Sequence, residues 1–306
     1  MKLLFLSLIV FVTISGYSQE ATFNNAKDST ASCYITFMPK GKPVGMLLLF
    51  DGYGGLPFSV PKETNLLQVA ADKGLIAIAA ALQDGGKTFY VDEVSQHCMD
   101  TLINTLYEKY NLTNEKLYLG GFSLGGSGVV KYTERTTRDT HLRKPNAIFV
   151  VDAPLDFERM YNVMKRSIRL NKTGNPNKED VFFSEIIKKR FGGTPETNIA
   201  AYRKISPYSF SDTTQQAIKQ LISMPVRYIT EPDIQWWMKN RLKEVYSINV
   251  TDGSAFVNEL KQLGNVNAEL ITTENKGYRD LQNTIRHPHS WSIAEPAETI
   301  AWLLKF

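Results

Sequence analysis

The sequence predicts an α/β fold in which a mostly parallel central sheet carries helices on both faces. Short apolar runs alternate along the chain with segments in which apolar residues recur every three or four positions, as on an amphipathic helix. This alternation is typical of parallel strands joined by crossover helices. The run at residues 44–50 (VGMLLLF) is apolar throughout, which favours a central strand buried on both faces.

The predicted elements follow one another over most of the chain. The expected strands are Cys33–Met38, Val44–Phe50, Leu75–Leu82, a run ending at Leu119, Ala147–Val151, Met224–Thr230 and Asn267–Thr273. The expected helices are Leu66–Asp72, a long helix between Val91 and Tyr110, one that includes Val129 to Tyr132, Trp236–Tyr246, Ser254–Leu263 and Pro296–Leu304. Between Gln19 and Lys42 we expect only the strand that starts at Cys33.

Residues 153–223 interrupt the alternation and have the pattern of several helices. We predict that they form a helical cap inserted into one α/β domain, residues 19–306. The cap carries twelve Lys and Arg against seven Asp and Glu. That surplus suits an ordinary solvated surface, or alternatively a cap that guides acidic substrates such as uronate-bearing or sulfated glycans.

Residues 1–18 have the features of a secretory signal peptide. Lys2 is followed by an apolar run at residues 3–14, which is short for a membrane span, and then by small residues at Gly16 and Ser18. We expect cleavage after Ser18 and export to the periplasm or beyond the cell, with no membrane anchor left; an uncleaved anchor is the alternative. Export would permit a disulfide between Cys33 and Cys98, which the sequence leaves open.

Composition and motifs exclude several classes of partner. The net charge of +4 over 306 residues is small, so we expect no nucleic-acid partner. No G-x-G-x-x-G opens a predicted helix, no Walker pattern is present, and the scattered Cys and His residues lack a metal-ligand spacing. We therefore predict neither a cofactor nor a metal.

A glycine-rich segment between a predicted strand and a predicted helix indicates a nucleophile. Residues 121–125, GFSLG, fit the G-x-S-x-G pattern, with Ser123 at the turn. Glycines are required there because side chains would collide with the adjoining strand and helix. The turn exposes the hydroxyl at a helix N-terminus, whose dipole favours developing negative charge.

A serine nucleophile needs a base and an acid that orients the base. His97 in the long helix and His141 in a charged segment suit structural or solvated roles, whereas His287 and His289 follow the last predicted strand. We choose His289 as the base, because Ser290 and Trp291 after it would anchor its loop, and assign His287 to substrate contact.

The acid is predicted from the strand ends. Asp233 stands three residues beyond the strand ending at Thr230, and it is our choice. Glu231, Asp152 and Asp156 are alternatives, and Asp233 would also suit a helix N-cap.

Two backbone N–H groups are predicted to stabilise an oxyanion. One belongs to Leu124, directly after the serine. The other belongs to Tyr53 in the loop at residues 51–55, DGYGG, whose glycines let a substrate approach closely; Gly54 is the next candidate in that loop.

These motifs together resemble the α/β-hydrolase superfamily over nearly all of residues 33–306. The resemblance rests on GFSLG, on the strand at residues 224–230 followed by Glu231-Pro232-Asp233, and on His289-Ser290-Trp291. It implies Ser123 as nucleophile, His289 as base and Asp233 as acid. The chain looks most like exported bacterial esterases and prolyl-oligopeptidase-like proteins, but it has Asp51-Gly52 where many relatives carry His-Gly.

The sequence therefore predicts an exported serine hydrolase that cleaves a carboxylic ester in a small molecule or an acylated glycan. A serine peptidase is the first alternative; the chain has no region resembling a β-propeller that would select peptides by size. A protein of the same fold that binds a ligand without turnover is the second alternative. Fold alone decides among none of these.

Overall fold

The computed structural model describes residues 19–23, 33–82, 89–171 and 177–306, so the predicted signal peptide lies outside the described residues. The strands are β1 Gln19–Phe23, β2 Cys33–Phe37, β3 Gly45–Phe50, β4 Leu75–Ala80, β5 Lys116–Phe122, β6 Ala147–Val151, β7 Val226–Thr230 and β8 Ala268–Thr272. In the described residues they form one sheet in the order β1-β2-β4-β3-β5-β6-β7-β8. Strands β3 to β8 are parallel, whereas β1 and β2 each run antiparallel to their neighbours.

The predicted mostly parallel sheet is confirmed, with two differences. Strand β1 was missed: its sequence QEATF lacks an apolar run, and its partner β2 supplies the pairing that makes it a strand. Strand β5 runs three residues beyond Leu119, through Gly120 and Gly121 to Phe122, because Gly121 pairs with Phe50 of β3. Ladder hydrogen bonds from the neighbours thus extend a strand through residues with low strand propensity.

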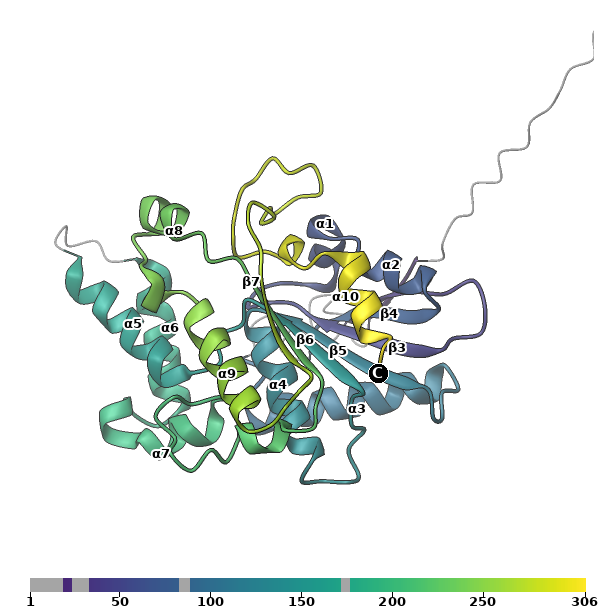
Figure 1. The fold of residues 1–306 in the computed structure, drawn as a ribbon, viewed down its shortest axis with the longest axis horizontal. Coiled ribbons are helices and arrows are strands. Elements are labelled where there is room, and N and C mark those ends of the chain that lie inside the picture. Colours follow the sequence, from purple (N-terminus) through teal and green to yellow (C-terminus); the bar gives the residue numbers. More distant parts are fainter. Residues whose placement is uncertain (1–18, 24–32, 83–88, 172–176) are drawn as a thin grey trace, which may run out of the picture.

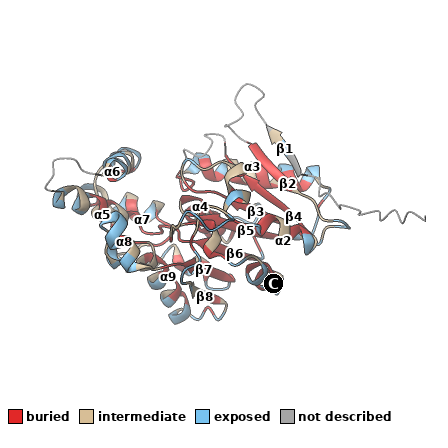
Figure 2. Ribbon diagram, turned by 90° about the horizontal axis from the view of Figure 1, so that it is seen from above, coloured by how far each residue is buried: buried red, intermediate tan, exposed pale blue. Residues whose placement is uncertain are grey.

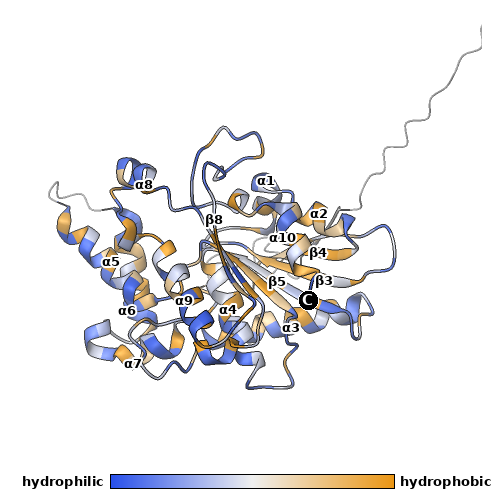
Figure 3. Ribbon diagram, in the orientation of Figure 1, coloured by the Kyte–Doolittle hydropathy of each residue, from blue (hydrophilic) through white to orange (hydrophobic). Residues whose placement is uncertain are grey.

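Helices cover both faces of the sheet, as predicted (Figures 1 and 2). One face packs against α2 (Leu66–Asp72) and α10 (Pro296–Leu303), and the other against α3 (Glu93–Lys109), α4 (Leu124–Thr136) and α9 (Val250–Gln262). Side chains of a strand point alternately to the two faces. Accordingly, Met46 and Leu48 of β3 enter one buried cluster and Leu47 and Leu49 the other. Figure 3 shows the apolar residues concentrated along these central strands.

The chain between β6 and β7 forms helices beyond the end of the sheet. These are α5 (Phe157–Leu170), α6 (Lys178–Arg190) and α7 (Pro195–Ile205), followed by a short 3₁₀ helix at Ile218–Leu221. Helix α5 packs against both α6 and α7, so the three form a layer of their own at one side of the molecule (Figure 1). None of the helices in the described residues is long and apolar enough to cross a membrane.

The strand order indicates where on the sheet a ligand site lies. Strands β4 and β5 lie on opposite sides of β3, so the connections that follow β3 and β5 diverge at the carboxyl edge of the sheet. Ligands of such sheets bind at this point. The loop that starts at Asp51 and the turn at Ser123 both leave the sheet there, after the paired residues Phe50 and Gly121.

We predict that Gly125→Ala lowers the free energy of unfolding by about 1–3 kcal/mol, the usual cost of overpacking. A Cβ at Gly125 would lie 2.3 Å from the carbonyl oxygen of Phe50, a backbone atom of the central strand. Urea denaturation measures the change. Gly41→Ala is the control, because its Cβ would meet nothing within 4 Å. Equal stabilities of the two variants would contradict the prediction.

Candidate active site

Ser123 occupies a sharp turn between β5 and α4. Its φ of 52° and ψ of −127° lie in a region that residues with side chains rarely adopt. A Cβ at Gly121 would lie 2.5 Å from the carbonyl carbon of Gly125, so the strand and the helix approach each other too closely for a side chain. The N–H of Ser123 donates to Val151 O at 2.9 Å, which holds the turn against β6. The turn therefore has the form expected of a nucleophile elbow.

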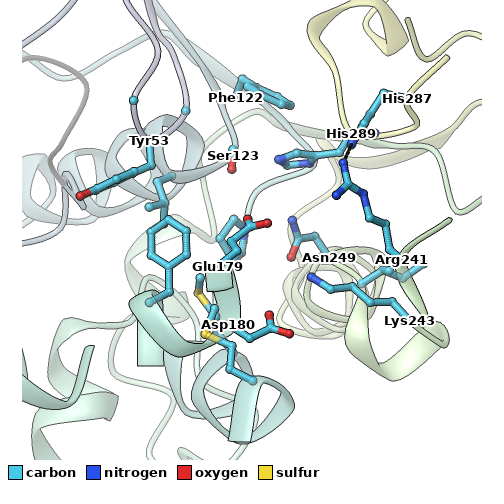
Figure 4. Close-up of a pocket in the computed structure, with 18 of the residues that line it drawn as sticks. Tyr53, Phe122, Ser123, Glu179, Asp180, Arg241, Lys243, Asn249, His287 and His289 are labelled. Carbon is cyan, nitrogen blue, oxygen red and sulfur yellow. Dashed lines mark hydrogen bonds between the residues drawn. The ribbon is translucent and has the colours of Figure 1, made fainter. Parts of the chain in front are cut away.

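His289 lies beside this turn and pairs with Asp152. His289 Nδ1 is 2.6 Å from Asp152 Oδ2, and the imidazole packs on Phe122 with ring centroids 4.4 Å apart. The His289 side chain is 18% exposed and Asp152 6%, so the imidazole reaches the cavity while the carboxylate stays behind it. In Figure 4 the ring of His289 points toward Ser123.

Asp152 is held rigidly at the end of β6. Its other carboxylate oxygen accepts a hydrogen bond from Thr230 Oγ1 at 2.7 Å, and its backbone oxygen accepts one from Asn249 Nδ2 at 2.8 Å. Its φ of 46° turns the chain sharply just after the strand. These contacts fix the position of Asp152, whose Oδ2 binds the imidazole.

Asp233 does not contact His289, and the prediction that it orients the base is wrong. Asp233 Oδ2 binds Arg286 Nη2 at 2.8 Å, and Oδ1 accepts from the N–H of Trp236, capping helix α8 (Ile234–Arg241). The loop after β8 crosses back over β5, where His289 packs on Phe122. The strand end beside it is therefore that of β6, with Asp152, an alternative weighed from the sequence.

The other two alternative acids have separate structural roles. Glu231 is buried and pairs with Arg286 at 2.5 Å, and it accepts the N–H of Lys276 at 2.8 Å. It thereby fastens the loop that leads to His289. Asp156 caps α5 by accepting the N–H of Arg159, and burial raises the pKa of its carboxyl group to about 6.

The loop after β3 is tied to the histidine loop through Asp51. The Asp51 carboxylate accepts hydrogen bonds from Trp291 Nε1 at 2.9 Å, from the N–H of Gly52 at 2.8 Å and from Ser59 Oγ at 2.6 Å. A Cβ at Gly52 would lie 3.1 Å from Ser123 Cβ, so the loop passes directly beside the serine. Asp51 therefore links the two loops that flank Ser123.

The two predicted oxyanion donors are the N–H groups of Leu124 and Tyr53. Leu124 is the first residue of α4, so its N–H has no acceptor within the helix. The N–H of Tyr53 donates no hydrogen bond to any other described residue. Both residues line the cavity with Ser123. Gly54, the next candidate, also lines it, but with φ of 79° at the exposed tip of the loop.

Ser123 and His289 open into a cavity of about 590 Å³, a size typical of small-molecule sites. One wall is apolar, where the Tyr53 ring packs edge-on against Phe183 and Phe182, and Met160 and Met164 of α5 extend it. The opposite wall carries Arg241 and Lys243, next to the end of α8, and His287. Helices α5 and α6 thus line the site together with the strand ends.

His287 is neutral at physiological pH. Burial and the nearby charges of Arg279, His289 and Arg241 lower its pKa to about 3. The N–H of His289 donates to His287 Nδ1 at 3.2 Å, so the proton of the neutral ring resides on Nε2. Arg241 Nη2 lies 3.4 Å from that Nε2 (Figure 4).

The four histidines fall into two groups. His97 and His141 are exposed and lie outside the cavity, and His287 and His289 both line it. Sequence reasoning missed Arg241, Lys243 and Asn249 of the cavity wall. The predicted helix continued to Tyr246, whereas α8 ends at Arg241 and is followed by Leu242, which has φ of 55°. No local signal marks that end, because leucine seldom adopts this conformation.

Comparison with family models identifies the chain. Residues 69–241, more than half of the sequence, match the model described as "Alpha/beta hydrolase of unknown function (DUF915)". The chain belongs to this family. The matched region includes Ser123 and Asp152 and ends before His289. Family membership places the protein among the α/β hydrolases and confirms the fold that the motifs predicted.

Solved structures share this fold at low sequence identity. Carboxyl esterase 2 from Tuber melanosporum is 12% identical with a TM-score of 0.59, over 96% of this chain and 86% of that one. The butyrate-bound esterase Est2 from Thermogutta terrifontis is 13% identical with a TM-score of 0.53, over 94% and 91%. Acylaminoacyl peptidase from Pyrococcus horikoshii is 14% identical with a TM-score of 0.55, over 88% of this chain but only 37% of the peptidase. No curated protein matches.

We predict that Trp291→Phe lowers the free energy of unfolding by about 2 kcal/mol, because the Asp51 carboxylate loses a buried hydrogen bond. Chemical denaturation measures the change. Trp236→Phe is the matched control, since the described hydrogen bonds include none from its indole N–H and its side chain is only partly buried. The assigned link between the two loops is wrong if both variants lose the same stability.

Proposed function

We propose that the chain is a serine hydrolase that cleaves carboxylic esters, with Ser123 as nucleophile, His289 as base and Asp152 as the acid that orients it. The observation that carries this proposal is the 2.6 Å contact between His289 Nδ1 and Asp152 Oδ2, made beside a serine in a strained turn. An imidazole whose Nδ1–H is bound to a carboxylate presents its Nε2 lone pair as a base.

The mechanism follows from this arrangement. Ser123 Oγ attacks the ester carbonyl carbon while its proton moves to His289 Nε2, and the N–H groups of Leu124 and Tyr53 stabilise the oxyanion. The bond to the alcohol oxygen breaks as His289 returns the proton to that oxygen. Water, deprotonated by the same imidazole, then attacks the acyl carbon; the bond to Ser123 Oγ breaks, His289 returns the proton to that oxygen, and the acid is released. The described residues contain no hydrogen bond between Ser123 and His289; in free enzymes this contact is often long and tightens when substrate binds.

An ester is the favoured bond because of the cavity. Its apolar wall, formed by Tyr53, Phe183 and Met164, suits a short acyl chain, and its polar wall suits a hydroxylated or acidic alcohol. An acylated carbohydrate would fit this division. The structural likeness to an esterase and to a peptidase concerns the fold, so the ester is chosen from the cavity and not from the likeness.

We further propose that residues 1–18 direct export and are removed. The support is the charge, apolar run and small residues of that segment. A mature chain starting at Gln19, detected by intact mass after expression in a secreting host, tests this; a chain that keeps residues 1–18 would contradict it.

Reaction with a fluorophosphonate tests the nucleophile. We expect one stoichiometric adduct on the wild type by intact-mass spectrometry and none on Ser123→Ala, because only an activated serine reacts. Ser211→Ala is the control, since Ser211 lies outside the Ser123 cavity, and it should label as the wild type does. A wild type that takes up no label would favour a ligand-binding protein without turnover.

Two acid variants test the corrected triad. We expect Asp152→Asn to lower kcat on 4-nitrophenyl butyrate at least about a hundredfold, because the imidazole loses its anionic partner. Asp233→Asn should stay within about threefold, since an asparagine still caps α8. The opposite result would restore the acid predicted from the sequence. Aminoacyl anilides assayed beside the ester distinguish a peptidase.

A further inference from the structure

Two cations of the cavity wall have no counter-charge among the described residues. Arg241 and Lys243 both line the cavity, and the recorded ion pairs of the described chain include neither. The nearby cations differ: Arg279 pairs with Glu63 at 3.0 Å, and Arg286 pairs with Glu231 and Asp233. Carboxylates thus pair with Arg279 and Arg286, which support the loops, whereas Arg241 and Lys243 line the cavity without an ion pair among the described residues.

The contact between Arg241 and His287 brings two donors together. Because His287 Nδ1 accepts the N–H of His289, Nε2 of the neutral ring carries a proton. Arg241 Nη2, 3.4 Å away, is also a donor and cannot use Nε2–H as an acceptor. Two N–H groups that converge in this way are placed to donate to one acceptor oxygen. An anionic oxygen satisfies both and also offsets the charge of Arg241.

Acidic residues on the opposite side restrict where an anion can sit. Glu179 and Asp180 of α6 also line the cavity, and Figure 4 shows them across from Lys243. Asp180 is buried and accepts a hydrogen bond from Ser167 Oγ at 2.6 Å. Because carboxylates repel an anion, a negatively charged group is directed to the side of Arg241 and His287.

Catalytic geometry assigns that side to the alcohol. His289 must protonate the departing oxygen, so the alcohol of the ester lies next to His289. The His287 ring is 6.3 Å from the His289 ring, and Arg241 Nη2 is 3.4 Å from His287 Nε2. A substituent on the alcohol therefore extends toward these groups, whereas the acyl chain has the apolar wall formed by Tyr53 and Phe183.

We propose that Arg241, Lys243 and the Nε2–H of His287 form a subsite for an anionic group, a carboxylate or a sulfate, on the alcohol portion of the substrate. The inference rests on the proposed esterase function and adds the charge of the alcohol to it. It makes the substrate an acyl ester of an acidic alcohol, such as a hydroxy acid or an acidic sugar.

Matched esters test the subsite. The probes are butyryl esters of 3-hydroxybenzoate, 3-hydroxybenzenesulfonate and the neutral 3-hydroxybenzamide, which share one acyl group and one ring. We expect kcat/KM at least about tenfold higher for an anionic ester than for the amide, the usual effect of a charged hydrogen bond. Preference for both anions, or for only the carboxylate or only the sulfonate, supports the subsite and identifies its ligand. Equal values for all three overturn it.

Charge variants assign the preference to the named residues. We expect Arg241→Gln and Lys243→Gln each to lower the ratio of anionic to neutral kcat/KM several-fold, and the double variant to bring it near one. Lys239→Gln is the matched control: it removes the same charge from α8 at an exposed position outside the cavity and should keep the wild-type ratio. A ratio unchanged in the double variant overturns the assignment.

A binding measurement separates failure of the subsite from failure of the esterase. The non-cleaved amides 3-(butanoylamino)benzoate and 3-(butanoylamino)benzamide are titrated into the wild type by calorimetry. Tighter binding of the benzoate, lost in the double variant, supports the subsite even if no ester is hydrolysed. Ester hydrolysis that depends on Ser123, with equal binding of both amides, retains the esterase and removes the subsite.

Discussion

The hydrogen bond between Asp152 and His289 is the contact on which the arrangement of the site depends. It joins the end of β6 to a loop 137 residues later in the chain. Each partner is held from behind, Asp152 by Thr230 and Asn249, and the histidine loop by Glu231 and Trp291. Since side chains with their own partners lose little freedom on binding, the imidazole is preorganised beside Ser123 before any ligand arrives.

Asp51, which stands where the resemblance to α/β hydrolases leads one to expect histidine, has a structural role. Its carboxylate is buried and accepts hydrogen bonds from Gly52, Ser59 and Trp291. A buried carboxylate requires such donors, because an unpaired charge in the interior is costly. The residue therefore anchors the loop that passes beside Ser123.

Charges are distributed unevenly around the cavity. The arginines that support the histidine loop are paired with carboxylates, whereas Arg241 and Lys243 are not, in the part of the chain that the structure describes. Surface ion pairs stabilise a fold only weakly, so an unpaired cation costs little in water. Lys243 is half-buried at the cavity wall, where less water screens its charge from a ligand than in bulk solvent, whereas Arg241 is exposed. Cations such as Arg241 and Lys243, unpaired among the described residues, are therefore better suited to binding a ligand than to stabilising the fold.

The sequence by itself determined the order of the strands from β2 onward and of the main crossover helices, the turn at Ser123, and the position of His287 and His289 after the last strand. These depend on local patterns: apolar runs, a glycine-rich turn, and position relative to the last strand. Only the tertiary structure decided which carboxylate meets the imidazole, because Asp152 and Asp233 both follow strand ends and both suit the role locally. The path of the loop over Phe122 selects Asp152, and Arg241, the last residue of α8, contacts His287. These contacts join residues 137 and 46 positions apart, so no local pattern exists from which either could be predicted.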